Sequence, residues 1–186
     1  MVVRAAYTMG IDFAGADRVW TIHKVSIIQM LPEAYLKEIL ATPGVKTATY
    51  GTWFGGSYQN KPNQFPVFAT DIEAYLKLYH EFQVPPAQFK AAMEDPQGVI
   101  VGKDTAARYG WKVGDRIPIL ADIWQPTEGQ TWYFNIRGIY DGDKTVDKTQ
   151  FLFHHKYFEE NRRNGKGTVN FYMIKIADPA QAAAIS

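Results

Sequence analysis

The hydrophobic and polar positions in the first third of the chain predict short strands separated by a short helix. Residues 18–28 are rich in β-branched and aromatic side chains, which favours a strand. A helix is predicted to begin at Pro32 and to end at 42–44, because apolar residues recur on one of its faces. Two further strands are predicted over 45–50 and 65–69.

The middle of the chain carries the clearest helix signal. Thr70 and Glu73 fit a capping box, in which each side chain binds a free backbone amide of the first turn. Apolar residues then follow at helical spacing over 72–79, which predicts an amphipathic helix. The short elements predicted after it are a helix over 85–94, a strand over 99–101 and a helix over 103–109 that ends at Gly110.

The last third of the chain is predicted to be mostly sheet. Strands are expected over 112–120 and 131–140, and Pro118 marks the first of them as an edge or bulged strand. In the second strand, Trp132, Phe134 and Ile136 are predicted on one face, and Tyr133, Asn135 and Arg137 on the other. A strand over 151–154, a helix over 157–163 and a strand over 168–176 complete the pattern. The mixed order predicts the α+β class, with a mixed, largely antiparallel sheet and short helices.

Composition excludes several classes of protein. The chain has 186 residues, with 20 basic and 19 acidic side chains and no cysteine. A hydrophobic content of 46% predicts a packed globular protein. A net charge of +1 gives no reason to expect nucleic acid as a partner. The lack of cysteine excludes disulfides, thiolate metal sites and cysteine nucleophiles.

Targeting and membrane segments are also not evident in the sequence. A membrane-spanning helix needs about 20 mostly apolar residues, and no such run occurs. The first residues do not resemble a signal peptide, because Asp12 interrupts a weakly apolar stretch. Asp178 and Pro179 predict a helix that the chain leaves after about two turns. We therefore expect either a cytoplasmic protein or, favoured by this last helix, a piece of a longer chain.

Candidate chemistry is sparse. Residues 98–104 approach a phosphate-binding loop, but the glycines are one residue too close and Asp104 replaces the required Ser or Thr. A strand-to-helix turn with a solvated Lys103 is the favoured interpretation. The pair Asp141 and Asp143 is interpreted as part of a loop rather than a calcium site.

Two adjacent histidines, His154 and His155, precede Glu159 and Glu160, but the spacing fits no familiar metal motif. Surface histidines beside a charged helix are the favoured interpretation. No catalytic residues, metal ligands or cofactor-binding residues are predicted, and the chain is expected not to be an enzyme.

Four aromatic residues are candidate contacts for a partner or substrate, the first three of them beside glycines: Trp53, Phe54, Tyr58 and Trp124. Their rings could stack on a ligand. Filling the core is at least as good an explanation for them.

Taken in order, the segments of the chain resemble one family, the MacB-like periplasmic core domain of FtsX-like ABC transporter permeases. The resemblance extends from about Ala16 to Pro179 and rests on order and spacing rather than on one motif. The segments that carry it are 18–32, 42–45, 51–59, 67–82, 98–117, 134–142 and 151–162.

The resemblance implies how the chain is organised. Residues 1–17 would be a membrane-proximal segment, 18–178 the periplasmic core domain and 179–186 the start of a helix leading toward the next membrane span. Two lobes are implied, a porter-like core and a smaller variable lobe at about 53–98.

The resemblance also implies location, partners and role. The domain would lie on the periplasmic or extracytoplasmic side of the cytoplasmic membrane, attached through flanking helices. Its partners would be an ATP-binding subunit or domain, a second permease copy and a periplasmic accessory protein. Its role would be non-catalytic, transmitting ATP-driven motion to substrate or to the accessory protein during export.

Two other functions stay open from the residues alone. One is a stand-alone periplasmic ligand-binding module that uses the four aromatic residues. The other is a hydrolase with dispersed catalytic residues, acting through His154 or His155.

Overall fold

The computed structural model describes residues 17–23, 29–121 and 123–178. It divides the chain into two compact units, unit 1 (Met1–Thr52 and Gly167–Ser186) and unit 2 (Trp53–Lys166). The predicted variable lobe at about 53–98 falls within unit 2. That lobe and the division into 1–17, 18–178 and 179–186 stay predictions. The predictions for 24–28 and 179–186 concern residues outside the described ranges.

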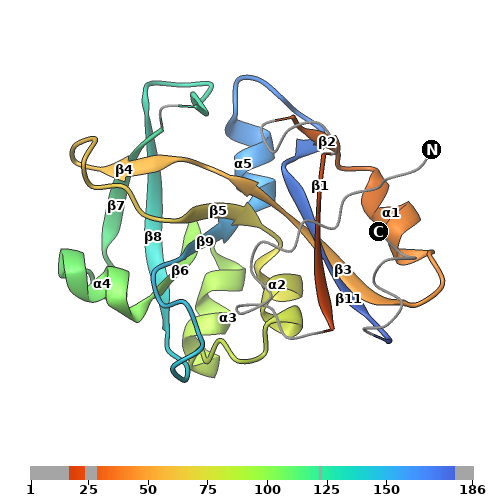
Figure 1. Ribbon diagram of the computed structural model, residues 1–186. Coiled ribbons are helices and arrows are strands. Elements are labelled where there is room, and N and C mark those ends of the chain that lie inside the picture. The colour runs from red at the N-terminus through yellow and green to blue at the C-terminus, as the bar shows by residue number, and fades with distance from the viewer. Residues whose placement is uncertain (1–16, 24–28, 122, 179–186) are drawn as a thin grey trace. The chain divides into compact units, whose positions relative to one another are not determined.

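Unit 1 is built from strands at both ends of the chain. Strand β11 (Phe171–Ile176) lies between β1 (Arg18–Ile22) and β3 (Val45–Trp53), and both pairings are antiparallel (Figure 1). A second, two-stranded sheet pairs β2 (Leu31–Pro32) with β10 (Thr168–Val169). Helix α1 (Tyr35–Leu40) follows β2, so the helix predicted from Pro32 begins three residues later and Pro32 belongs to a strand.

The core of unit 1 is small and mostly aliphatic. Partly buried side chains of α1 pack against it, among them Tyr35, Leu36 and Ile39. Its buried members are Leu31, Ala48, Val169, Tyr172, Ile174 and Ile176. The hydroxyl of Tyr172 donates to the carbonyl of Pro32, which ties β11 to the turn before α1.

Unit 2 contains six strands in the order β5-β9-β6-β8-β7-β4. The strands are β4 (Gly56–Tyr58), β5 (Val67–Thr70), β6 (Gly98–Gly102), β7 (Arg116–Ala121), β8 (Thr131–Tyr140) and β9 (Phe151–His154). The helices are α2 (Ile72–Leu78), α3 (Pro86–Glu94), α4 (Lys103–Tyr109) and α5 (His155–Asn161) (Figure 1). Two pairings, β5 with β9 and β6 with β8, are parallel and the others are antiparallel. The predicted α+β class with a mixed, largely antiparallel sheet is confirmed.

Aromatic side chains fill the core of unit 2. Phe54 is fully buried, and four rings meet it at steep angles: Trp132, Phe134, Phe153 and Phe158. Such edge-to-face contacts add to the free energy gained by burying the rings. Phe54 is therefore a central core residue.

Strand β8 confirms the predicted alternation, with one shift. Trp132, Phe134 and Ile136 are buried, whereas Tyr133 is exposed. The register against β6 slips after Ile136, since Val99 pairs with Ile136 but Ile100 pairs with Gly138. A bulge of this kind reverses which residues face each side of the sheet beyond it.

Capping residues in the sequence predicted the end of one helix correctly and the N-cap of another wrongly. The helix over 72–78 begins where expected, but its N-cap is Asp71, whose carboxylate accepts from the amide of Ala74 at 3.0 Å. Thr70 instead ends β5 and is fully buried, so the capping box was wrong. Helix α4 spans the predicted residues, and Gly110 ends it in the left-handed conformation.

The strand predicted over 112–120 begins only at Arg116. Residues before it form a turn, in which the amide of Lys112 donates to Asp115 and Gly114 has φ +101°. Strand β7 has neighbours on both sides, but its pairing with β4 stops at Ile119. Pro118 therefore lies just past that pairing, where its missing amide donor costs no ladder hydrogen bond.

Candidate functional site

The four candidate aromatic residues lie in different environments. The ring of Trp53 is 43% exposed, whereas Phe54 has no exposed surface and cannot meet a partner in this conformation. Tyr58 and Trp124 are half-buried and pack against the core of unit 2. The four rings therefore do not form one common exposed platform, and a contact role for Trp53 stays a prediction.

Trp124 connects the loop between β7 and β8 to its surroundings through hydrogen bonds and a cation–π contact. Its indole nitrogen donates to the carbonyl of Trp53 at 2.9 Å, and its own carbonyl accepts from Trp132 at 2.7 Å. The guanidinium of Arg162 lies 5.3 Å from the Trp124 ring and 4.6 Å from that of Phe158. These contacts indicate a structural role for Trp124 rather than a ring available for stacking.

Trp53 forms a small exposed apolar surface with Ile123. The Trp53 ring packs edge-on against Phe68, with centroids 5.3 Å apart. Gly55 lies between the two side chains, because a Cβ on it would be 3.1 Å from Ile123 and 3.2 Å from the Trp53 indole nitrogen. Ile123 is 60% exposed.

The segment that approaches a phosphate loop is occupied by contacts within the chain. The amides of Gly102 and Asp104 donate to the carbonyls of Gln150 and Lys148. A Cβ at Gly102 would lie 2.0 Å from the Lys148 carbonyl oxygen, so only glycine allows this close approach. The segment is the predicted strand-to-helix turn.

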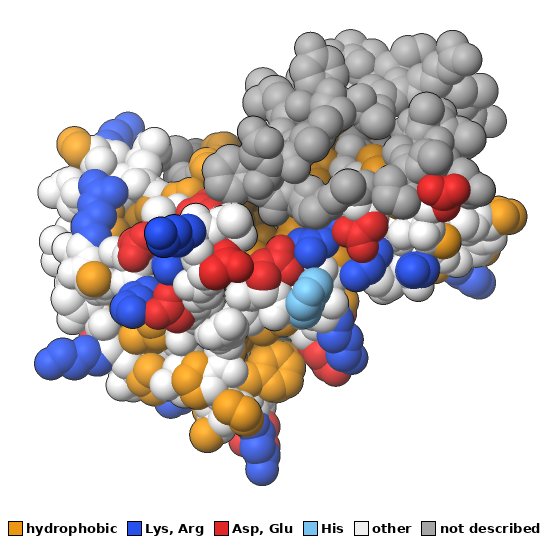
Figure 2. Space-filling view, turned by 60° about the horizontal axis from the view of Figure 1, so that its bottom comes forward, with side chains coloured by type: hydrophobic (Ala, Val, Ile, Leu, Met, Phe, Trp, Pro, Cys, Tyr) orange, Lys and Arg blue, Asp and Glu red, His pale blue; other side chains and the backbone are white. Residues whose placement is uncertain are grey.

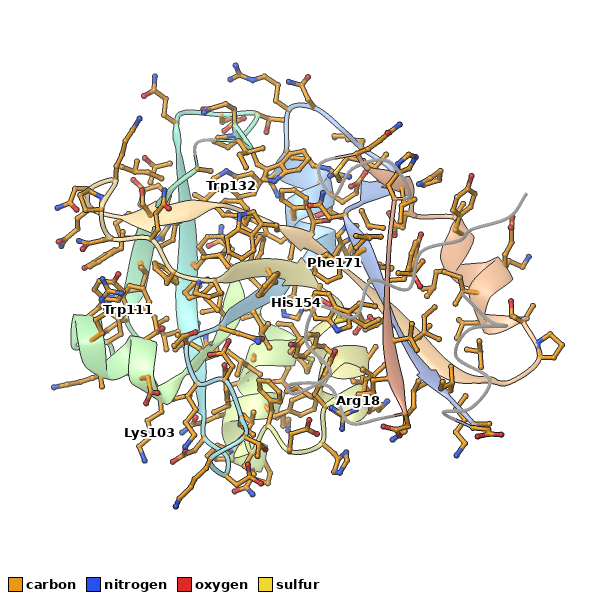
Figure 3. The ribbon with its side chains drawn as sticks, in the orientation of Figure 1. Arg18, Lys103, Trp111, Trp132, His154 and Phe171 are labelled. Atoms are coloured by element: carbon orange, nitrogen blue, oxygen red, sulfur yellow. The ribbon has the colours of Figure 1, made fainter. Side chains whose placement is uncertain are left out.

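Lys103 does more than face solvent. Its ammonium lies 2.6 Å from Asp141, and Lys148 lies 3.1 Å from the same carboxylate (Figure 3). The hydrogen bond from Lys103, with further ones from Gly142 and Lys148, holds the pKa of Asp141 well below its usual range. Figure 2 shows positive and negative side chains intermingled on the face in view, without a large patch of one sign. Asp141 and Asp143 belong to a loop, as predicted, and Asp143 accepts from both the amide and the hydroxyl of Thr145.

The two histidines differ in burial. His154 ends β9, and its Nε2 lies 2.8 Å from the carbonyl oxygen of Ala92 (Figure 3). His155 begins α5 and is only 4% exposed, because the helix packs this side of its first turn into the protein. The prediction of two surface histidines is therefore wrong for His155.

A further surface lies on β7 and β8, on the side of the sheet away from Trp132 and Phe134. We call it the outer face and define it by Arg116, Pro118, Leu120 and Tyr133. The guanidinium of Arg116 lies 4.9 Å from the centroid of the Tyr133 ring. Leu120 is 39% and Tyr133 44% exposed. The alternation of β8 already predicted Tyr133 on the opposite side from the core, but the strand pairing that brings Arg116 to it is not visible in the sequence.

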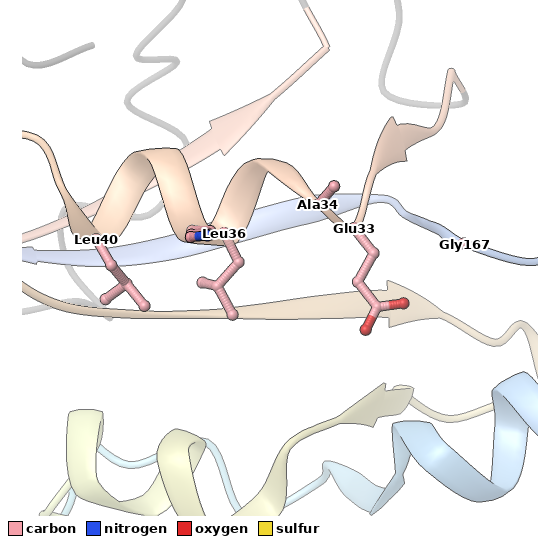
Figure 4. A pocket seen from close by; sticks show the side chains of 6 residues that line it. Glu33, Ala34, Leu36, Leu40 and Gly167 are labelled. Carbon is pink, nitrogen blue, oxygen red and sulfur yellow. The ribbon is translucent and has the colours of Figure 1, made fainter.

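Unit 1 has an open groove along α1. It encloses about 540 Å³ and is lined by Glu33, Ala34, Leu36, Lys37, Leu40 and Gly167 (Figure 4). Leu40 is 48% exposed there. The lining combines two leucines with one acidic and one basic side chain, and it contains no set of groups typical of catalysis.

None of the helices in the described part of the chain combines the length and the apolar character needed to cross a membrane.

Comparisons with known proteins identify a family and a fold. A family model described as the MacB-like periplasmic core domain matches residues 1–186. A search of curated proteins found no match.

Two solved structures are similar in fold. The extracellular domain of the ABC-type transporter YknZ from Gram-positive bacteria has 10% identity and a TM-score of 0.59, with 84% of this chain and 78% of that chain covered. The periplasmic region of MacB from Actinobacillus actinomycetemcomitans has 11% identity and a TM-score of 0.60, with 92% and 79% covered.

Proposed function

Because this chain belongs to the family of MacB-like periplasmic core domains, we propose that it transmits ATP-driven motion to a substrate or an accessory protein during export. The chain is a periplasmic or extracellular domain of a MacB/FtsX-like ABC transporter permease. The transporter's other subunits, an ATP-binding subunit or domain and a second permease copy, are its proposed partners. The domain itself is proposed to be non-catalytic.

The observation that carries this proposal is the position of the two ends of the described chain. Arg18 of β1 pairs with Lys175 of β11, and the amide of Ile176 donates to the carbonyl of Asp17 at 2.9 Å. The ammonium of Lys175 lies 3.3 Å from the Asp17 carboxylate. Burial acts to raise the pKa of Asp17, but the hydrogen bond and charge of Lys175 outweigh it, and the pKa is lowered. Membrane helices attached at both ends would therefore pull on neighbouring strands.

The links from unit 1 to unit 2 are also on neighbouring strands. Unit 2 leaves unit 1 after Thr52 of β3 and returns at Gly167, shortly before β11. In unit 1, Gly51 pairs with Phe171, and the amide of Asn170 donates to the Gly51 carbonyl at 3.0 Å. Motion of β1 and β11 would pass through the antiparallel ladder to β3, and so to both links.

ATP hydrolysis is assigned to another part of the transporter. The amides that a phosphate loop would offer to nucleotide are bound here by carbonyls of 148 and 150, and Lys103 is paired with Asp141. A domain of this kind would contribute by its rigidity. The dense aromatic core of unit 2 supports such a role, because close-packed interiors transmit strain.

The test removes unit 2 from the full-length permease. Residues 53–166 are replaced by a four-residue Gly-Ser linker, which the pairing of Gly51 with Phe171 allows unit 1 to accommodate. We expect export to fall at least tenfold while ATP hydrolysis changes less than twofold. A Gly-Ser insertion between Glu128 and Gly129, in an exposed loop of unit 2, is the matched control and should leave export unchanged. Export at the original level without 53–166 would contradict the proposal.

A further inference from the structure

The outer face of β7 and β8 has the properties of a protein-docking surface. Resting on the proposed function, we propose that it binds an acidic, extended segment of the transporter's periplasmic partner. A carboxylate of that segment would pair with Arg116, and apolar side chains of the segment would cover Leu120 and Tyr133.

The register of the two strands makes the outer face continuous. Pro118 pairs with Tyr133, and Leu120 pairs with Thr131. Leu120 and Tyr133 are therefore diagonal neighbours on one side of the sheet, at a distance of about 7 Å that large side chains bridge. Both are among the most exposed large apolar residues of unit 2.

The face is left uncovered because α3 ends too early. The last turn of α3 leads to Asp95, whose carboxylate accepts from Asn135 at 2.9 Å and from Nε of Arg137 at 2.8 Å. Tyr133 lies two residues before Asn135, nearer the start of β8 than this contact. Tyr133 stays 44% exposed, with the Arg116 guanidinium 4.9 Å from the centroid of its ring.

The charge of the face determines the chemistry of the partner. Arg116 is exposed and pairs with no carboxylate among the described residues, whereas the nearby Arg137 is neutralised by Asp95. Stacking on Tyr133 holds the guanidinium in place, which lowers the entropy lost when it binds a carboxylate. An acidic group in the partner is thus complementary to the one unneutralised charge on this surface.

The composition of the face favours a protein over a membrane surface. Tyrosine and arginine are enriched at the energetic centres of protein interfaces. Recognition of anionic lipid needs a cluster of about four or more basic residues, and this face offers a single unpaired arginine. The pleated surface also suits a segment whose alternate side chains point toward it.

A second arginine–tyrosine pair supplies an internal control. Arg108 is exposed and lies 5.1 Å from the ring of Tyr109. Tyr109, however, packs into the core cluster against Trp111 and Phe65, so this pair adjoins the core and not an exposed apolar face. Arg108→Gln removes the same charge and the same kind of stacking contact without touching the outer face.

The experiment measures binding of defined peptides to the full 186-residue chain by calorimetry. The probe is an acetylated nine-residue peptide with Glu and Leu in turn at its odd positions and Ser at its even positions, so that both kinds of side chain point to one side of the extended segment. The control peptide has Lys in place of Glu. We expect saturable binding of the acidic peptide only, weakened at least fivefold by Arg116→Gln and by Tyr133→Ala, and less than twofold by Arg108→Gln. Circular dichroism confirms that each variant is folded.

Three results would overturn the proposal: no saturable binding of the acidic peptide, with or without Arg116-dependent binding to phosphatidylglycerol vesicles, equal binding of both peptides, or binding that Arg116→Gln does not weaken. The outcome is separable from that of the proposed function. If the peptides fail but replacement of 53–166 abolishes export, the docking surface is wrong and the transmission role stands. If that replacement leaves export intact, the transmission role fails whatever the peptides do.

Discussion

The two sides of the β7–β8 ladder have the same backbone and opposite surroundings. On the inner side, Ile117, Ile119, Trp132 and Phe134 are at most 4% exposed. On the outer side, Leu120 and Tyr133 are 39% and 44% exposed, although they are as apolar or aromatic as their inner neighbours. Residue type alone therefore does not decide burial in this sheet. What decides it is whether another element covers the face.

The covering elements account for the difference. Trp132 and Phe134 meet rings from β9 and α5, including those of Phe153 and Phe158. On the other side α3 packs along β8 only as far as Asp95 reaches, at Asn135 and Arg137. The inner side is therefore a structural core, whereas the outer side stays exposed at Leu120 and Tyr133.

The largest expected effect comes from emptying the inner side. Phe134→Ala removes a fully buried ring that contacts five other aromatic side chains and should lower the free energy of unfolding by about 4 kcal/mol. Urea denaturation measures this loss. A loss as small as that of an exposed residue would show that the inner side is not the core.

Overpacking the inner side should lower the free energy of unfolding by less than Phe134→Ala does. In Gly56→Ala, the new Cβ would lie 2.5 Å from Cγ2 of Ile119 and 3.0 Å from a ring carbon of Phe54. The packed neighbours must shift, and we expect a loss of about 2 kcal/mol in urea denaturation. Unchanged stability would mean that β4 and β7 are packed more loosely than the structure indicates.

At the covered end of the outer side, Asp95 makes stability depend on pH. Burial acts to raise the pKa of Asp95, but hydrogen bonds from Asn135, Arg137 and the amide of Gln97 outweigh it, and the pKa is lowered. The folded state then binds the proton more weakly than the unfolded state, so the stabilisation is complete above the unfolded pKa of about 4 and is lost as pH falls below it.

Asp95→Asn should accordingly cost about 1.5 kcal/mol near pH 7, where the charge-assisted hydrogen bonds are intact. The difference in unfolding free energy between this variant and the original chain should shrink from pH 5 to pH 2.5, as followed by urea titrations. If the difference in unfolding free energy between the two chains were constant with pH, ionisation of Asp95 would not be the cause of the pH dependence.

The smallest effect is expected on the open part of the outer side. Tyr133→Ala removes an exposed ring and one cation–π contact and should change the unfolding free energy by at most about 1 kcal/mol. A loss of unfolding free energy close to that of Phe134→Ala would contradict the assignment of the inner side to the core and the outer side to the surface.

Much of this architecture follows from local patterns. The alternation of β8 predicted which side of that strand is buried, and the strand over 131–140 and the helix over 103–109 have the predicted bounds. These elements are predictable because strand alternation and helix-capping glycine act over a few neighbouring residues.

Other features depend on contacts that are distant in the sequence. The aromatic residues Trp53 and Phe54 adjoin flexible glycines, and only the continuation of β3 through Trp53 decides that Phe54 enters the core. The burial of His155 depends on how α5 packs, and the cap at Asp71 depends on β5 ending one residue later than expected.

Of the outer face, the sequence predicted the orientation of Tyr133 but not the approach of Arg116. Periodicity indicated that Tyr133 points away from the core. The approach of Arg116 depends on the pairing of Pro118 with Tyr133, and the sequence does not specify the register of that pairing across the nine-residue connection from β7 to β8. The early end of α3, which leaves the face open, is likewise a tertiary property.

Transmission through the outer face is tested most directly by export from the full-length permease carrying Arg116→Glu. Export is measured together with ATP hydrolysis and beside the matched Arg108→Glu. We expect Arg116→Glu to lower export at least fivefold with hydrolysis within twofold of the original, because a negative charge would repel an acidic partner from the outer face. Arg108→Glu should leave both activities within twofold. Equal export by the two variants would contradict the claim that this domain delivers motion through the outer face.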